Sequence, residues 1–292
     1  MLEVPGGLYH PWGKGLMGHK GLVDLERISG LPLCLELQEC RLVFEGNLPP
    51  VLPDVRTIAG ARDFLLDLHT QGPEELYYMY RGVHRPQDEV VMEKFGLRFD
   101  ITVLRPGLVG KEFIRTVGHY HPKKPGTDLT YPEVYEVLFG EAHYLLQKPD
   151  EGLQGVLDVI LVRARPGDKV VILPNYGHIT INPGPGPLAM ANWVAADFSS
   201  VYGPMKELRG GAYYEVAPGH FLPNPRYSPL PLLREMRPAE MPEFGLYSGR
   251  PMYPSGIEDP RRLRFLTHPE EFQNFFPRAL TPRTTDHGLL RI

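Results

Sequence analysis

From about residue 75 to residue 195, short hydrophobic runs alternate with turns rich in Gly and Pro. Runs of this length that recur every 8–12 residues or so are typical of the strands of a β-sandwich or barrel. The pattern therefore predicts an all-β domain over residues 75–204. The predicted strands are Leu76–Val83, Leu97–Leu104, Glu112–Val117, Val134–Leu138, Ala142–Gln147, Val156–Arg163, Lys169–Leu173, His178–Ile181 and Leu188–Val194.

The two flanks of this domain follow other patterns. Residues 1–74 are predicted to be an extension that packs one helix, Arg56–His69, on the core, because apolar residues recur there at helical spacing. Arg56 is assigned to the solvated side of that helix. Residues 205–292 are predicted to be an extended and partly helical tail that wraps over the domain or over a partner subunit.

Composition narrows the class of protein. The chain is 42% hydrophobic and 23% charged, with a net charge of −4, so a basic face for nucleic acid is not expected. No apolar run approaches the ~20 residues of a membrane span, and residues 1–20 have no signal-peptide core. Cys34 and Cys40 are too few for a disulfide framework. The sequence is therefore expected to be cytoplasmic.

The candidate chemistry lies in three strand-like segments. His119 and His121 are two residues apart, so a β-strand would present both imidazoles on one face. Glu133 opens the next apolar run, and His178 enters a later one. Three imidazoles and a carboxylate suit Zn, Fe, Ni or Mn. With 11 His in the chain, one His-x-His pair could arise by chance, but the four candidates together predict a metal site.

Two motifs carry a resemblance to a known family. TVGHYH (residues 116–121) and EVYEVLFG (133–140) are motifs of the cupin superfamily. With TVLRPGLVGKEF (102–113), they resemble the cupin-type glucose-6-phosphate isomerases, a metal-dependent family of archaea and some bacteria. The resemblance covers roughly residues 55–205. It implies a cupin jelly-roll barrel that interconverts glucose 6-phosphate and fructose 6-phosphate as a homodimer.

The resemblance also implies roles for individual residues. One divalent transition metal per subunit, of unassigned identity, would be held by the four positions that match the family's ligands. The sugar phosphate would be held by three other matching positions, and two tyrosines would line the substrate cavity. The ligands are His119, His121, Glu133 and His178, the phosphate contacts are Thr102, Thr116 and Gly118, and the tyrosines are Tyr77 and Tyr135.

Without the resemblance, plainer roles remain open for these residues. Thr is common in strands, so Thr102 and Thr116 could be ordinary strand residues, and Tyr77 could be a core residue. His143 is expected to point outward from its strand, and Asn182 is expected to brace a turn.

The chain departs from the family at a few positions. Val117 stands where the family often has Lys, so Arg115, Lys123 or Lys124 is a candidate to supply the missing charge. Near Val194, where the family can place a pocket tyrosine, this chain has only Trp193.

These residues are compatible with several mechanisms and functions. Glu133 could act both as a metal ligand and as a proton shuttle through a cis-enediol intermediate. Alternatively, Glu133 could be a purely structural ligand, with another residue as the base or with a metal-assisted hydride shift in place of proton transfer. The alternatives to the isomerase are a mannose-6-phosphate isomerase, a dioxygenase with the same ligands, or a non-catalytic sugar-phosphate-binding cupin.

Overall fold

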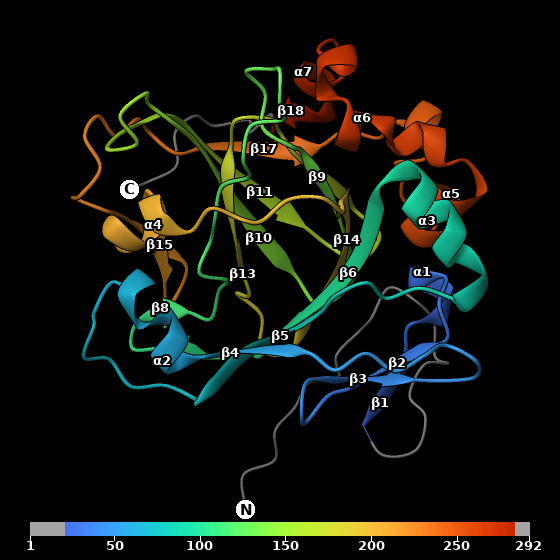
Figure 1. Ribbon diagram of the computed structural model, residues 1–292. Helices are drawn as coiled ribbons and strands as arrows, with labels where there is room; N and C mark the ends of the chain where they lie inside the picture. The colour runs from blue at the N-terminus through green and yellow to red at the C-terminus, as the bar shows by residue number, and fades with distance from the viewer. Residues whose placement is uncertain (1–20, 284–292) are drawn as a thin grey trace, which may run out of the picture.

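The computed structural model describes residues 21–283, and two β-sheets form its centre. Six strands lie side by side in the order β12-β9-β14-β6-β5-β4, and the other sheet has the order β13-β10-β11-β17-β18 (Figure 1). The expected all-β jelly-roll barrel is confirmed. The strands of the six-stranded sheet are β4 (Asp54–Thr57), β5 (Glu75–Tyr80), β6 (Leu97–Leu104), β9 (Glu133–Phe139), β12 (Lys169–Ile172) and β14 (Leu188–Ala195). Those of the five-stranded sheet are β10 (Ala142–Pro149), β11 (Val156–Ala164), β13 (Gly177–Ile181), β17 (Arg234–Pro238) and β18 (Leu280–Pro282).

One predicted strand is wrong over most of its length. In place of Glu112–Val117, the structure has only the two-residue β8 (Glu112–Phe113), followed by an extended segment that makes isolated bridges. Gly118 interrupts the ladder, because it has a φ of 80° and a Cβ there would lie 2.4 Å from the Ile179 side chain. The metal-ligand candidates that follow therefore lie on an irregular segment.

The predicted helix Arg56–His69 is too long. The segment contains the end of β4, then α2 (Ile58–Ala61) and a 3-10 turn (Arg62–Phe64). Thr57 is extended and its hydroxyl accepts a hydrogen bond from Gly60 N at 3.2 Å, so it caps a helix of a single turn. Arg56 consequently lies on a strand that pairs with β5, opposite Tyr77.

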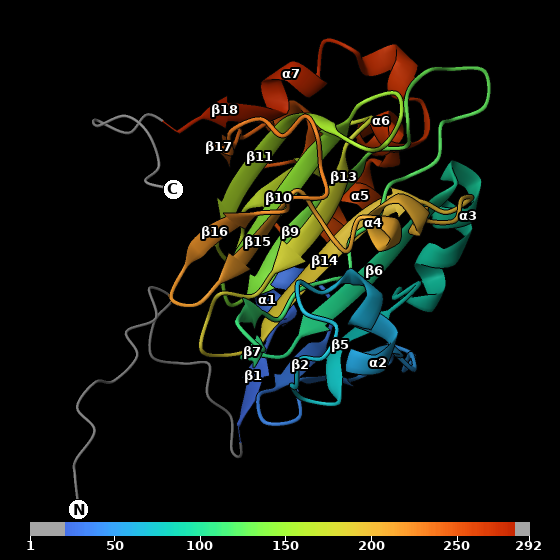
Figure 2. The ribbon, with the colours of Figure 1, turned by 90° about the vertical axis from the view of Figure 1, so that its left-hand side faces the viewer.

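Both faces of the six-stranded sheet are buried. The face toward the other sheet lines the interior of the barrel, whereas the outer face packs under C-terminal helices (Figure 2). On that outer face Trp193 lies 4.9 Å from Phe99 and stacks on Tyr253 at 5.7 Å, between ring centroids. The helices after β17 are α5 (Met252–Glu258), α6 (Arg264–Thr267) and α7 (Phe276–Ala279), with 3-10 turns at Pro242–Phe244, Pro260–Leu263 and Pro269–Phe272.

The C-terminal segment is fixed to the barrel by buried polar contacts as well as by apolar packing. Met252 N donates to the carboxylate of Glu136 at 2.7 Å, and Met252 O accepts from the Trp193 indole at 3.1 Å. Lys169 completes the group with an ion pair of 2.8 Å to Glu136. A buried carboxylate is thus balanced by one cation and one backbone donor.

The remaining elements surround these sheets. A three-stranded sheet near the N-terminus has the order β1-β2-β3, and a four-stranded one, β16-β15-β8-β7, lies beside the barrel (Figure 1). Their strands are β1 (Leu22–Asp24), β2 (Leu33–Glu36), β3 (Arg41–Phe44), β7 (Leu108–Val109), β15 (Tyr213–Val216) and β16 (His220–Pro223). The other helices are α1 (Glu26–Ser29), α3 (Glu89–Phe95) and α4 (Gly203–Glu207), with a 3-10 turn at Pro86–Asp88.

The predicted division into residues 1–74, 75–204 and 205–292 stays a prediction. Strands from both flanks join the central sheets, since β4 pairs with β5 and β17 pairs in parallel with β11. Residues 1–20, where the absence of a signal core was read, and residues 284–292 lie outside the described residues. Between residues 21 and 283, no helix has both the length and the apolar character that a membrane crossing requires.

Candidate active site

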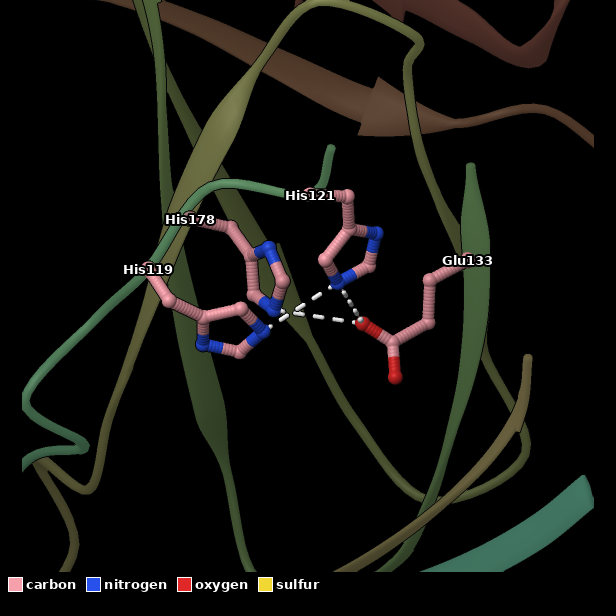
Figure 3. Close-up of side chains that lie close together, drawn as sticks. All are labelled: His119, His121, Glu133 and His178. Carbon is pink, nitrogen blue, oxygen red and sulfur yellow. Dashed lines mark hydrogen bonds and ion pairs between the residues drawn. The ribbon is translucent and has the colours of Figure 1, made fainter. Parts of the chain in front are cut away.

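Four side chains from three parts of the chain converge at one end of the barrel interior (Figure 3). His119 and His121 lie on the segment between β8 and β9, Glu133 is the first residue of β9, and His178 is the second residue of β13. The first and last of these are held together by their backbones, because His119 N and His178 N each donate to the other's carbonyl, at 3.3 and 3.1 Å. The structure thus brings together all four predicted ligands.

The spacing of the four donor atoms fits a metal ion. His119 Nε2 lies 3.1 Å from His121 Nε2, and Glu133 Oε2 lies 3.6 Å from His121 Nε2 and 3.3 Å from His178 Nε2. Two ligands that bind one ion at about 2.1 Å lie roughly 3.0–3.5 Å apart. Glu133 Oε2 is buried and accepts no hydrogen bond, which is costly unless a cation or a donor completes the site.

The ionisation of the cluster also suits a metal. Burial lowers the pKa of His119 well below its usual value, and neighbouring His178 and His121 lower it further. Burial likewise lowers the pKa of His121 to about 4. Burial alone would raise the pKa of Glu133, but the adjacent histidines hold it below its ordinary range. His119 and His121 are therefore neutral at pH 7 with lone pairs available, opposite an ionised carboxylate.

A second layer of contacts orients His121. Its Nδ1–H donates to the carbonyl of Tyr131 at 2.8 Å, which leaves Nε2 as the lone-pair nitrogen that faces the cluster. Phe198 covers the same imidazole at 4.5 Å between centroids and stacks on Tyr131 at 5.0 Å. The loop before Glu133 thus fixes the tautomer of this histidine.

Tyr135 lies next to the cluster, with its hydroxyl 3.2 Å from His178 Nε2. Burial raises the pKa of this phenol well above its usual value, and the negative charge of Glu133 adds to the effect. The hydroxyl therefore remains protonated at any physiological pH and can act as a hydrogen-bond donor in the cavity.

The predicted phosphate contacts line the same cavity as the cluster. Tyr77 is buried, and its hydroxyl accepts a hydrogen bond from Val117 N at 3.2 Å. Thr116 Oγ1 accepts from Thr180 N at 2.9 Å, so its own O–H remains available as a donor. Thr102 and Gly118 also lie on the wall of the cavity.

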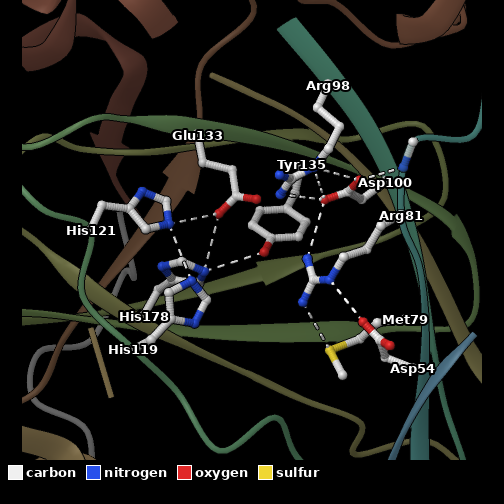
Figure 4. A network of polar contacts seen from close by, with 11 residues as sticks. Asp54, Met79, Arg81, Arg98, Asp100, His119, His121, Glu133, Tyr135 and His178 are labelled. Atoms are coloured by element: carbon white, nitrogen blue, oxygen red, sulfur yellow. Dashed lines mark hydrogen bonds and ion pairs between the residues drawn. The ribbon is translucent and has the colours of Figure 1, made fainter. Parts of the chain in front are cut away.

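Sequence reasoning missed the cations of the cavity. Arg81 and Arg98 line it together with the buried Asp100 (Figure 4). A signal was present in the sequence, because polar and hydrophobic residues alternate along the first part of β6. This alternation places Arg98 and Asp100 on the same face of the strand as Thr102. Polar alternation of this kind usually marks a solvated face. Here the face forms the wall of the cavity.

The described residues that line the cavity do not include the cations proposed from the sequence, Arg115, Lys123 and Lys124. Arg115 is buried, pairs with Glu112 at 3.0 Å and donates to the backbone of the 3-10 turn after α2. Lys123 pairs with Asp128 on the surface, and Lys124 pairs with Glu270 of the C-terminal segment. Val194 does line the cavity, whereas Trp193 faces the opposite side of the sheet.

His143 does not point outward as expected. It is 3% exposed, and its Nδ1–H donates to the carboxylate of Glu215 at 2.8 Å, while Arg163 Nη1 donates to its Nε2 at 2.9 Å. The hairpin β15–β16 covers this face of β10, which sequence alternation alone does not reveal. Asn182 braces the turn as expected, by donating to Gly186 O at 3.0 Å and accepting from Gly184 N.

Fold and cluster together define a cupin with the donor set of a metal centre. Residues 59–231 match the family model described as Glucose-6-phosphate isomerase (GPI), and the chain belongs to this family. A protein named glucose-6-phosphate isomerase from Thermococcus gammatolerans is 31% identical over 195 residues, which cover 63% of this chain and 92% of that protein. One of the same name from Thermococcus onnurineus is 38% identical over 171 residues, 56% of this chain and 79% of its own length.

Two solved structures illustrate more distant likenesses. Oxalate decarboxylase from Bacillus subtilis matches with a TM-score of 0.32 and 18% identity, over 45% of this chain and 29% of its own. An oxalate oxidase in complex with glycolate matches with a TM-score of 0.29 and 18% identity, over 37% of this chain and 46% of its own.

Proposed function

We propose that this protein is a metal-dependent glucose-6-phosphate isomerase, which interconverts glucose 6-phosphate and fructose 6-phosphate. The observation that carries the proposal is the convergence of His119, His121, Glu133 and His178 in a cavity of a chain from this family. Relatives named glucose-6-phosphate isomerase share the aligned region at 31–38% identity. The substrate is accordingly a sugar phosphate.

We propose that the same four residues hold one divalent transition ion, with Fe, Ni, Zn and Mn all suited to three imidazoles and one carboxylate. When bound, such an ion supplies a Lewis acid that polarises the carbonyl group of the open-chain sugar. The neutral imidazoles and the Glu133 carboxylate oxygen that accepts no hydrogen bond support this assignment.

Glu133 is the proposed base of the reaction. Its carboxylate takes the proton from C2 of the open-chain aldose and returns it to C1, while the hydroxyl proton on O2 passes to O1, so that C1 becomes a CH2OH group and C2 becomes the carbonyl carbon. The reverse transfers convert the ketose. Its ionised state and its position in the cavity support this role. The Tyr135 hydroxyl donates a hydrogen bond to a sugar oxygen. A hydride shift from C2 to C1 is the alternative, in which the carboxylate serves as ligand only.

The phosphate group of the substrate is assigned to Thr102, Thr116 and the backbone N–H of Gly118, with Tyr77 beside them. Their common position on the cavity wall supports this assignment. The Thr hydroxyls and the backbone N–H of Gly118 are donors suited to phosphate oxygens. A homodimer and a cytoplasmic location are proposed from the family resemblance and the composition alone.

Turnover of fructose 6-phosphate by metal-stripped protein tests the function. The product is followed through a coupled glucose-6-phosphate dehydrogenase, while Fe, Ni, Zn and Mn are added back one at a time. We expect activity with at least one ion and none in His119→Ala. A folded, metal-binding protein that remains inactive with every ion would refute the isomerase. Mannose 6-phosphate, offered in the same assay, tests a wider substrate range.

A further inference from the structure

The phosphate subsite assigned above consists of neutral donors, whereas a phosphate monoester carries a charge of about −1.5 to −2 at pH 7. Transferring such a charge out of water is costly unless a cation accompanies it. Val117, next to the predicted phosphate contacts, is apolar and buried, so it supplies no charge. The cavity therefore needs a cation from another element.

Arg81 and Arg98 are the cations among the described residues that line the cavity. Arg98 is committed to Asp100, to which its Nε and Nη2 donate at 3.0 Å. Asp100 is buried and also accepts from Gly82 N at 2.8 Å. Removing Arg98 from this pair would leave a buried carboxylate short of its charge partner. Arg98 is therefore a poor candidate for a group that must reach a substrate.

Arg81 is held much more loosely. Its Nη1 lies 3.4 Å from Asp100, its Nε lies 3.2 Å from the exposed Asp54, and its Nη2 lies 3.5 Å from the sulfur of Met79 (Figure 4). These contacts use three of the five N–H donors of a guanidinium, and one of them goes to a weak acceptor. The side chain is 42% exposed, so it has room to turn.

The position of Arg81 matches the assigned phosphate contacts. Its contact with Met79 draws the guanidinium back along β5, and Met79 is the direct cross-strand partner of Thr102. Arg81 and His119 line the same cavity. Arg81 therefore lies in the same space as both the metal cluster and the wall that carries Thr102.

We propose that Arg81 is a specificity-determining residue, whose guanidinium leaves its long contacts with Asp100 and Met79 and pairs with the phosphate of the substrate. This inference rests on the proposed isomerase function and names the cation of its phosphate subsite. Asp100, still held by Arg98 and Gly82 N, remains satisfied when Arg81 moves. The site consequently changes its pairing on binding without exposing an unpaired buried charge.

The test combines steady-state kinetics with phosphate binding by metal-loaded protein. In Arg81→Met, which keeps the apolar stem, we expect the KM for fructose 6-phosphate to rise by about 10–100-fold with kcat nearly unchanged, because a charge-assisted hydrogen bond is lost. The inhibition constant of inorganic phosphate should rise in parallel. Arg81→Lys should recover part of both effects, since it restores the charge but not the planar fork.

Arg234→Met is the matched control. Arg234 pairs with Asp158 at 2.6 Å on the five-stranded sheet and is half exposed, so its loss removes an arginine of similar exposure away from the cavity. It should leave KM and phosphate inhibition unchanged. If Arg81→Met folds and both constants equal those of the wild type, the inference is overturned. A fall in kcat alone would also overturn it, because that result assigns Arg81 to support of the metal cluster.

Failure of the proposed function can be told apart from failure of this inference. If the wild-type protein isomerises no sugar phosphate with any ion, calorimetric binding of inorganic phosphate to the metal-loaded protein still decides. Binding that is present in the wild type and in Arg234→Met but absent in Arg81→Met supports the anion site. Equal binding in all three, or none in the wild type, rejects it.

Discussion

Two buried clusters in this barrel use the same residue types and differ in how completely they are satisfied. In the cluster around Glu133, the lone-pair nitrogens and a carboxylate oxygen face one another, and that oxygen accepts no hydrogen bond. In the cluster around His143, Glu215 accepts from one ring nitrogen and Arg163 donates to the other. Most side chains of both clusters are buried, yet only the second cluster is complete within the protein.

The difference separates a site from a structural brace. A buried acceptor left unpaired costs stability, so its persistence indicates that something outside the chain completes it. The His143 cluster instead joins β15 to β10 and β11, with Glu235 of β17 also pairing with Arg163 at 3.0 Å. Its polar groups hold the C-terminal segment in place, whereas those around Glu133 are arranged to bind a metal ion.

The largest effect should come from Glu133→Gln. The amide cannot take up the proton, so kcat should fall by roughly 10²–10⁴-fold. The free energy of unfolding of the metal-stripped protein should fall little or rise, because the substitution removes a buried negative charge whose Oε2 accepts no hydrogen bond. Coupled-assay kinetics and urea unfolding measure the two quantities. A loss of stability with activity retained would reverse the assignment of this cluster.

The same substitution in the other cluster, Glu215→Gln, should do the opposite. It weakens the hydrogen bond from His143 Nδ1–H, at a cost of about 1–3 kcal/mol in the free energy of unfolding. Turnover per folded molecule and metal content should stay at wild-type values. Loss of turnover in a protein of normal stability would mean that the second cluster takes part in the chemistry.

A smaller effect is expected from Tyr135→Phe. The substitution removes only the hydroxyl next to His178 and keeps the buried ring, which packs 5.3 Å from Tyr144. We expect kcat/KM to fall by about tenfold, which is a usual cost of losing a group that contacts a metal ligand. The metal content should be unchanged, because Tyr135 is outside the ligand set. Tyr144→Phe, which alters a buried hydroxyl further from the cluster, is the control. An equal loss in both variants would point to packing.

Much of the barrel could be predicted because most of its strands are short hydrophobic runs between turns rich in Gly and Pro. The predicted Leu97–Leu104 coincides with β6, and Leu188–Val194 stops one residue before the end of β14. The four candidate ligands were also predictable, because their spacing is tied to strand starts and turns. The prediction of a helix over Arg56–His69 failed because Thr57 is extended and the helix after it has a single turn. In the sequence, this arrangement gives the same spacing of apolar residues as a longer helix.

The missed features share one physical cause. Alternating polar residues predict a face toward water, but Arg98, Asp100 and His143 alternate toward surfaces that distant segments cover. Asp100 is 3% exposed because the other strands of the barrel enclose it, and His143 because the β15–β16 hairpin does. Long-range coverage of this kind leaves no local pattern in one sequence.

The covering of the outer face of the six-stranded sheet has a consequence for where this molecule can be cut. The family match ends at residue 231, whereas Met252, Tyr253 and Phe265 lie beyond it and are buried against that sheet. A fragment trimmed to the matched region would present Trp193 and its apolar neighbours to water and leave Glu136 without its backbone donor. In this chain the folding unit therefore extends beyond the region that matches the family.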